Sequence, residues 1–146
     1  YRTDRVGDVT YHGPGQLVGY PVVSLRNRAG LVGGYLRDLE QMLILALAEF
    51  GLAARTVPGL TGVWIGEEKI AAIGIKVNSK RVSGHGFALN VTTDLSYFDR
   101  IVPCGIGDKG VASLQRLLNR PVPLLDVAHK IAAAFSQVFG SGRLGK

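Results

Sequence analysis

The chain has 146 residues, of which 47% are apolar, and its 17 basic and 11 acidic side chains give a formal net charge of +6. This length fits one domain with its own hydrophobic core and excludes two full domains. No apolar run approaches the roughly 18 residues of a membrane span, and these residues contain no signal-peptide pattern, so we expect no membrane association. A single cysteine excludes an internal disulfide and a multi-cysteine metal site, and it suits a reducing compartment such as the cytosol.

The positive charge predicts an acidic partner. Nucleic acid is the usual partner of a basic protein, but here the basic residues are scattered along the chain instead of forming a run. An acidic protein partner fits the charge equally well.

The first functional candidate in chain order is a polar loop. Residues 4–16 read DRVGDVTYHGPGQ, in which hydrogen-bonding side chains stand beside glycines that admit a ligand. Composition alone gives even odds that His12 is an ordinary surface histidine. The next stretch, LVGYPVVSL at 17–25, predicts a buried strand, and Pro21 favours an edge position or a bulge within it.

Apolar residues spaced by three and four then predict an amphipathic helix from about Leu31 to Phe50, whose stripe belongs to the core. The sequence GVWIGEEKIAAIGIKV at 62–77 predicts a β-hairpin with Trp64 packed inside and Lys69 at the start of the second strand. Small residues after Lys69 leave space for an acyl chain or a flat ligand. The commoner interpretation of such a lysine is a hairpin side chain in water.

The second half of the sequence predicts shorter elements. Residues 78–84 indicate an exposed polar turn, HGFALNVTTDL at 85–95 a strand with His85 at its mouth, and residues 95–100 a helical turn. Residues 111–118 predict a short helix, and apolar residues from 127 to 138 share one face of a last helix, before a frayed tail at 140–146. Grouped strands with helices beside and after them predict an α+β domain, a mixed β-sheet packed with helices.

The only thiol, Cys104, lies between Pro103 and Gly105, which favour a shaped loop over a helix. A lone cysteine is more often a small buried hydrophobe than a nucleophile, by about 4 to 1. A thiol attacks as thiolate, and an ordinary pKa of about 8.5 leaves only a few per cent ionised at neutral pH. A reactive Cys104 therefore needs a cation or base, and the upstream candidates are Lys69, Lys76 and His85.

Three blocks together resemble the lipoyl(octanoyl) transferases, which move an octanoyl group from acyl carrier protein to a lysine of lipoyl-accepting domains. The blocks are DRVGDVTYHGPGQLVGYP at 4–21, KIAAIGIKV at 69–77 and HGFALNVTTDLSYFDRIVPCGI at 85–106. Their order and spacing agree with the family nearly from end to end. The resemblance implies a biotin/lipoate protein ligase-like fold, one catalytic domain over 1–146, and neither a metal nor a cofactor.

The resemblance also implies roles for individual residues. Cys104 matches the nucleophile that carries the acyl thioester, and Lys69 matches the lysine that lowers the thiol pKa and shuttles the proton. The implied substrate-binding residues are Arg5, Val6, Gly7, Asp8, Val9, Thr10, Tyr11, His12, Ala72, Ile73, Gly74, His85, Gly86, Phe87 and Ala88.

The implied partners are octanoyl-acyl carrier protein, which is acidic, the lipoyl domains of 2-oxoacid dehydrogenase complexes, and the glycine cleavage H protein. We expect no nucleic acid, no membrane and a monomer, in the cytoplasm or, in a eukaryote, in an organelle. Two departures stand out: Val6 occupies a position where the family has glycine, and the chain begins at Tyr1 inside a dense motif, so we expect the N-terminal part of the family domain to be missing.

Two other classes of function stay open. One is a lipoyl amidotransferase or an ATP-dependent lipoate ligase on the same scaffold. The other is a non-catalytic basic module that binds acyl carrier protein or nucleic acid without chemistry.

Overall fold

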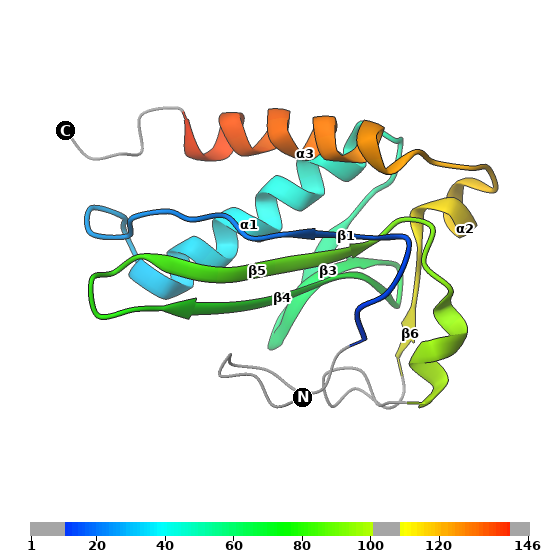
Figure 1. Cartoon of the computed structure of the whole chain (residues 1–146), viewed down its shortest axis with the longest axis horizontal. Helices are drawn as coiled ribbons and strands as arrows, with labels where there is room; N and C mark the ends of the chain where they lie inside the picture. The colour runs from blue at the N-terminus through cyan, green and yellow to red at the C-terminus, as the bar shows by residue number, and fades with distance from the viewer. Residues whose placement is uncertain (1–10, 101–108, 141–146) are drawn as a thin grey trace.

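The computed structural model describes residues 11–100 and 109–140, and its elements follow one another as shown in Figure 1. They are β1 (Gln16–Gly19), α1 (Leu31–Ala48), β2 (Arg55–Val57), β3 (Leu60–Ile65), β4 (Glu68–Val77), β5 (Ser83–Asn90), the 3-10 helix η1 (Leu95–Arg100), β6 (Gly110–Val111), α2 (Leu114–Leu118) and α3 (Leu124–Phe139).

The strands form one sheet in the order β1-β5-β4-β3-β2, and all these neighbours are antiparallel. The short strand β6 pairs with the start of β4 in the parallel sense. The predicted α+β class with a mixed sheet is therefore confirmed.

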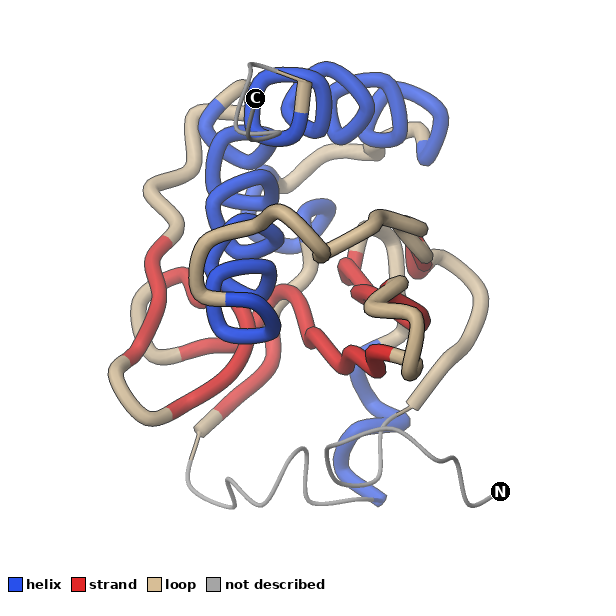
Figure 2. Tube along the Cα trace, turned by 90° about the vertical axis from the view of Figure 1, so that its left-hand side faces the viewer, coloured by secondary structure: helices blue, strands red, loops and turns tan. Residues whose placement is uncertain are grey.

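The hydrophobic core lies between one face of this sheet and the helices α1 and α3. Most of the apolar stripe of α1 is buried there, together with residues of β3, β4, β5 and α3. The two long helices cross obliquely (Figure 1), with the first half of α1 against the end of α3: the ring of Tyr35 contacts that of Phe139, with centroids 6.0 Å apart. Figure 2 shows α3 across the top, α1 running down from it, and strands on both sides of the lower part of α1. The other face of the sheet has no long helix on it within the described part of the chain.

An irregularity in β4 decides which side chains reach that helix-free face. Val63 pairs with Ala71, but the next residue of β3, Trp64, pairs with Lys69, so Ile70 is an extra residue on β4. Such a bulge turns two successive side chains to the same side. Both Ile70 and Ala71 accordingly belong to the hydrophobic core, and Lys69 is left on the opposite face.

Several predicted boundaries were wrong. The expected strand at 17–25 is regular only over β1, at the edge of the sheet, and Tyr20 and Val22 beyond it are exposed. The expected helix at 111–118 begins only at Leu114, because Val111 belongs to β6. The exposed turn at 78–84 ends earlier than predicted, since the buried Ser83 already begins β5.

The close approach of β1 to β5 gives a test of the fold. A Cβ on Gly86 would lie 2.1 Å from the carbonyl oxygen of Gly19 and 2.8 Å from Cδ of Pro21, whereas a Cβ on Gly33, exposed in α1, would meet nothing within 4 Å. We expect Gly86→Ala to lower the free energy of unfolding by about 1–3 kcal/mol, as overpacking does. Gly33→Ala should raise it by about 0.5–1 kcal/mol, because alanine suits a helix better.

Thermal unfolding followed by circular dichroism measures both changes. A Gly86→Ala protein as stable as the unmodified chain would contradict the close packing of β1 on β5.

Candidate functional site

Lys69 lies in the sheet and not in water. It is the second residue of β4, it is 6% exposed, and its Nζ lies 5.1 Å from the centre of the Trp64 ring. An ammonium over an indole face is stabilised by the electron density of the ring. The interpretation of Lys69 as a solvated hairpin lysine was therefore wrong, whereas the predicted packing of Trp64, 1% exposed, is confirmed.

A second ammonium approaches the same ring. Nζ of Lys109 lies 5.9 Å from the centre of the Trp64 ring and 2.6 Å from Oε2 of Glu67. The hydrogen bond and charge of Lys109, with the nearby Arg55, hold the pKa of the Glu67 carboxyl below its usual value. Glu67 is thus ionised at neutral pH, and its charge balances that of Lys109.

The segments around residues 72–74 and 85–88, predicted separately from the sequence, are brought together by direct strand pairing. Ala72 lies opposite Ala88 and Gly74 opposite Gly86 across β4 and β5. These small residues are on the same face as Lys69, away from the helices, because their neighbours along each strand belong to the hydrophobic core. Ala72 and Gly74 are half-buried, whereas Ala88 and Gly86 are buried, Gly86 against Pro21. The four residues form a strip of small residues that starts beside the lysine.

The remaining predicted residues of these strands lie elsewhere. The side chains of Ile73 and Phe87 pack in the hydrophobic core, so only their backbone faces a ligand on the strip. His85 lies opposite Ile75 with a φ of 58°, a backbone conformation that few residues other than glycine adopt, and its ring meets the edge of Tyr20.

The loop before β1 is held over the same end of the sheet. The ring of Tyr11 stacks on Tyr97 of η1, with centroids 5.0 Å apart, and meets Phe98 edge-on. His12 is exposed, and its Nδ1 lies 3.1 Å from Oε1 of Gln16 in β1. Cys104 and the predicted ligand residues from Arg5 to Thr10 lie outside the described residues.

Two polar residues join this loop to the sheet: sequence reasoning included Gln16 in the polar loop without a role of its own, and it missed Asn90. Gln16 donates to Oδ1 of Asn90, which is 5% exposed, and Asn90 donates to the carbonyl of Ala112 after β6. Gln16 stands in the first of the three recognised blocks and Asn90 in the third, and both occupy positions of their strands that face away from the core. The alternation of apolar and polar residues along each strand was the available signal that both side chains face away from the core. Nothing in the sequence, however, indicates that two residues 74 positions apart are in contact.

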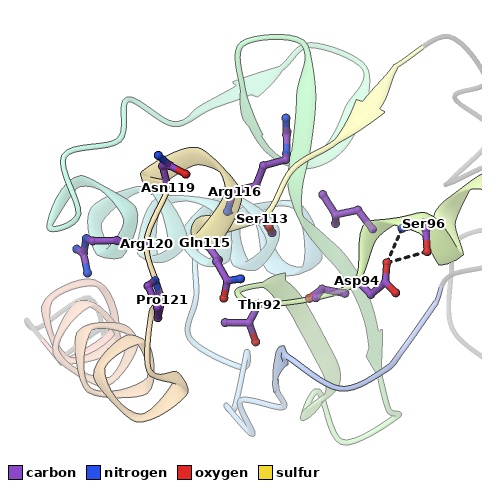
Figure 3. Close-up of a pocket in the computed structure, with 11 residues that line it drawn as sticks. Thr92, Asp94, Ser96, Ser113, Gln115, Arg116, Asn119, Arg120 and Pro121 are labelled. Atoms are coloured by element: carbon purple, nitrogen blue, oxygen red, sulfur yellow. Dashed lines mark hydrogen bonds between the residues drawn. The ribbon is translucent and has the colours of Figure 1, made fainter.

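Figure 3 shows a cavity that was not predicted, between the end of β5 and α2. Its volume is about 650 Å³ and most residues that line it are polar, with Arg116 and Arg120 on one side and Asp94 on the other. The hydroxyl and backbone N–H of Ser96 lower the pKa of the Asp94 carboxyl. Arg116 also pairs with Glu68, the residue before Lys69, so the cavity wall abuts the start of β4.

No three carboxylate, imidazole or thiol side chains gather closely enough to hold a metal ion within residues 11–100 and 109–140. In the same residues, no helix combines the length and the apolar character needed to cross a membrane.

Known proteins resemble the chain in sequence over nearly its whole length. It is 54% identical over 138 residues to an octanoyltransferase of Rubrobacter xylanophilus, a match that covers 94% of this chain and 62% of the relative. It is 50% identical to a chloroplastic octanoyltransferase of Arabidopsis thaliana, over 95% of this chain and 53% of that protein. The chain thus spans little more than half the length of these relatives.

Solved structures with low sequence identity share the fold. A lipoate-protein ligase A bound with ATP superposes with a TM-score of 0.78 at 20% identity, over 94% of this chain and 57% of that one. A biotin protein ligase from Aquifex aeolicus superposes with a TM-score of 0.68 at 15% identity, over 88% and 54%. The predicted biotin/lipoate protein ligase-like fold is therefore confirmed.

The sequence model of one family, described as the lipoyl protein ligase A/B catalytic domain, matches residues 1–136. This match covers most of the chain and establishes its family. The pairing of the two predicted strand segments beside a buried lysine agrees with it. The chain belongs to the lipoyl protein ligase A/B catalytic domain family.

Proposed function

We propose that this chain is an acyltransferase that moves an octanoyl group from acyl carrier protein, through a thioester on Cys104, to a lysine of a lipoyl-accepting domain. The observation that carries the proposal is the buried ammonium of Lys69 at the end of a strip of small residues. The octanoyltransferase relatives, at about half identical residues, support the same reaction.

The topology supports a partnership between Lys69 and Cys104. Val111 of β6 lies opposite Lys69, and the N–H of Ala112 donates to the Lys69 carbonyl. The sequence segment that contains Cys104 immediately precedes this strand. A protonated Lys69 beside the sulfur favours thiolate over thiol, and so lowers the pKa of Cys104.

The strip of small residues suits an extended acyl chain. Each CH2 removed from water contributes roughly 0.8 kcal/mol, so an octanoyl group laid along the strip gains several kcal/mol of binding. Larger side chains than those of Ala72 and Gly74 would occupy that space. In this proposal the backbone around the strip, including that of Ile73 and Phe87, lines the acyl site.

The proposed partners follow from the reaction. The donor, octanoyl-acyl carrier protein, is acidic and complements the net charge of +6; the acceptors are lipoyl domains of 2-oxoacid dehydrogenases and the glycine cleavage H protein. We place the reaction in the cytoplasm, or in an organelle of a eukaryote, and expect a monomeric catalytic domain. An ATP-dependent ligase is the alternative on this fold, and it differs in requiring a nucleotide to activate the acid.

The central prediction concerns the covalent intermediate. Incubation with octanoyl-acyl carrier protein should add one octanoyl mass to the intact protein, located on Cys104 by peptide mapping, and Cys104→Ser should abolish this thioester. Lys69→Ala should slow adduct formation by at least about 100-fold, since the thiol loses its activating ammonium. Lys76→Ala is the matched control, because Lys76 is an exposed lysine of the same strand, and its rate should stay within about twofold.

An unmodified Cys104, or a Lys69→Ala protein as fast as the control, would contradict the assignment. Formation of an acyl-adenylate from ATP and octanoate, with no transfer from acyl carrier protein, would favour the ligase.

The strip can be tested through acyl chain length. Ala72→Leu adds three carbons to the helix-free face, so we expect it to slow transfer from octanoyl-acyl carrier protein by about 10-fold or more and to leave transfer from the butyryl donor nearly unchanged. Ala133→Leu, exposed on α3, is the control and should leave the ratio of the two rates unaltered. If Ala72→Leu slowed transfer from the octanoyl and butyryl donors equally, the acyl chain would not bind along the strip.

A further inference from the structure

Four hydrogen bonds connect the exposed ring of His12 to the backbone of Lys69. Nδ1 of His12 lies 3.1 Å from Oε1 of Gln16, Nε2 of Gln16 donates to Oδ1 of Asn90 at 3.0 Å, and Nδ2 of Asn90 donates to the carbonyl of Ala112 at 3.1 Å. The N–H of Ala112 then donates to the carbonyl of Lys69 at 2.9 Å. We call the side chains of His12, Gln16 and Asn90 the histidine relay.

The direction of every bond in the histidine relay is fixed from its buried end. The Ala112 carbonyl can only accept, so the Asn90 atom facing it is the amide nitrogen, and the Asn90 oxygen faces Gln16 as an acceptor. Gln16 must therefore donate to Asn90, and its nitrogen also donates to the carbonyl of Tyr11 at 2.9 Å. Two acceptors thus orient the Gln16 amide, and its oxygen is left to face His12.

An oxygen acceptor at Nδ1 requires a proton there. Neutral His12 consequently carries its hydrogen on Nδ1 and presents an unprotonated Nε2, because the two nitrogens of a neutral imidazole share one proton. A side chain held in this tautomer accepts a proton at Nε2.

The proposed transfer reaction needs such a group, as a count of its protons shows. In the first half, the Cys104 thiolate forms a C–S bond to the acyl carbonyl carbon, and the carrier thiolate leaves and takes the proton of Lys69. In the second half, the acceptor lysine begins as an ammonium and ends as an amide, so it loses two protons when its nitrogen replaces sulfur. Neutral Lys69 takes back only one of them, and the Cys104 sulfur leaves as thiolate.

We propose that Nε2 of His12 accepts the other proton, from the ammonium of the acceptor lysine, and that Gln16 and Asn90 are positioning residues that hold His12 in the required tautomer. This inference rests on the proposed octanoyl transfer. After the transfer His12 releases its proton to water, to which its ring is open. The enzyme then returns to a thiolate, a protonated Lys69 and a neutral His12.

The first test reads the tautomer without any turnover. A two-bond 15N–1H correlation spectrum at about pH 8.5, where an ordinary imidazole is neutral, should show His12 with its hydrogen on Nδ1, assigned by the signals lost in His12→Gln. Gln16→Ala should shift His12 toward the other tautomer, and Gln41→Ala, an exposed glutamine of α1, should not. Asn90→Asp keeps an oxygen facing Gln16 but cannot donate to Ala112, so it should lower the melting temperature and preserve the tautomer. A hydrogen on Nε2 in the unmodified protein would overturn the relay.

The second test separates the half-reactions. His12→Gln should transfer octanoyl from acyl-Cys104 to a lipoyl domain about 10- to 100-fold more slowly at pH 7, the loss expected when a general base is removed, and it should slow this step more than it slows the acylation of Cys104. Gln16→Ala should slow the same step by about three- to tenfold, since it leaves His12 present but less well oriented.

The pH dependence of the transfer rate tests whether the proton that His12 accepts comes from the acceptor lysine. Between about pH 7 and about pH 9 the neutral fraction of an ordinary lysine rises roughly 100-fold, so the acceptor needs His12 less and the His12→Gln defect should shrink to within about threefold. Among titratable and charged groups of the described residues, Tyr97 stacks on Tyr11 of this loop, and the guanidinium of Arg100 lies over the Tyr97 ring. Tyr97→Phe should therefore show no comparable change with pH.

The outcomes distinguish this inference from the function on which it rests. If the unmodified protein forms no acyl-Cys104, the proposed function fails and the inference fails with it. If Cys104 is acylated but His12→Gln transfers at the normal rate, or its defect does not change with pH, only the role of His12 is overturned.

Discussion

The extra residue in β4 is the constraint on which the arrangement of this site depends. Strict alternation would turn Lys69 toward the same side as Ala71, into the apolar layer beneath α1. An ammonium there would lose its hydration among aliphatic side chains, at a cost of several kcal/mol. The bulge instead gives Ile70 to the core and places Lys69 against Trp64. One irregular residue thus makes a buried lysine compatible with a stable sheet.

Near Lys69, the two faces of β4 and β5 carry side chains of different size. The helix-facing side chains are large and tightly packed, and they hold β4 and β5 in register. The side chains on the other face are small, and Ala72 and Gly74 stay partly exposed there. Polar side chains occur where the small-residue strip ends, at Gln16 and Asn90, and there each amide nitrogen has an acceptor. Buried amides that are satisfied in this way stabilise one geometry in preference to others.

Much of the fold was predictable from periodicity. The helix stripe beginning at Leu31 and the hairpin around Glu67 follow the periods of 3.6 and 2 that packing imposes, and both were confirmed. The burial of Lys69 was not predictable, because a bulge inverts the facing that alternation predicts and leaves no mark in composition. The contact of Gln16 with Asn90 depends on the pairing of β1 with β5, which a single sequence does not encode locally.

The middle of α1 connects the outside of the molecule to the strand beside the lysine. Glu40 is 1% exposed, and its carboxylate accepts the N–H of Gly62 at 3.3 Å and meets the guanidinium of Arg37 at 2.6 Å. Gly62 has a φ of 117°, and a Cβ there would sit 3.3 Å from Cε of Lys69. An arginine on the solvent side of a helix thereby steadies, through one hidden carboxylate, the backbone against which the amine rests. A change at that outer arginine would therefore alter the position of the Lys69 amine on the opposite side of the sheet.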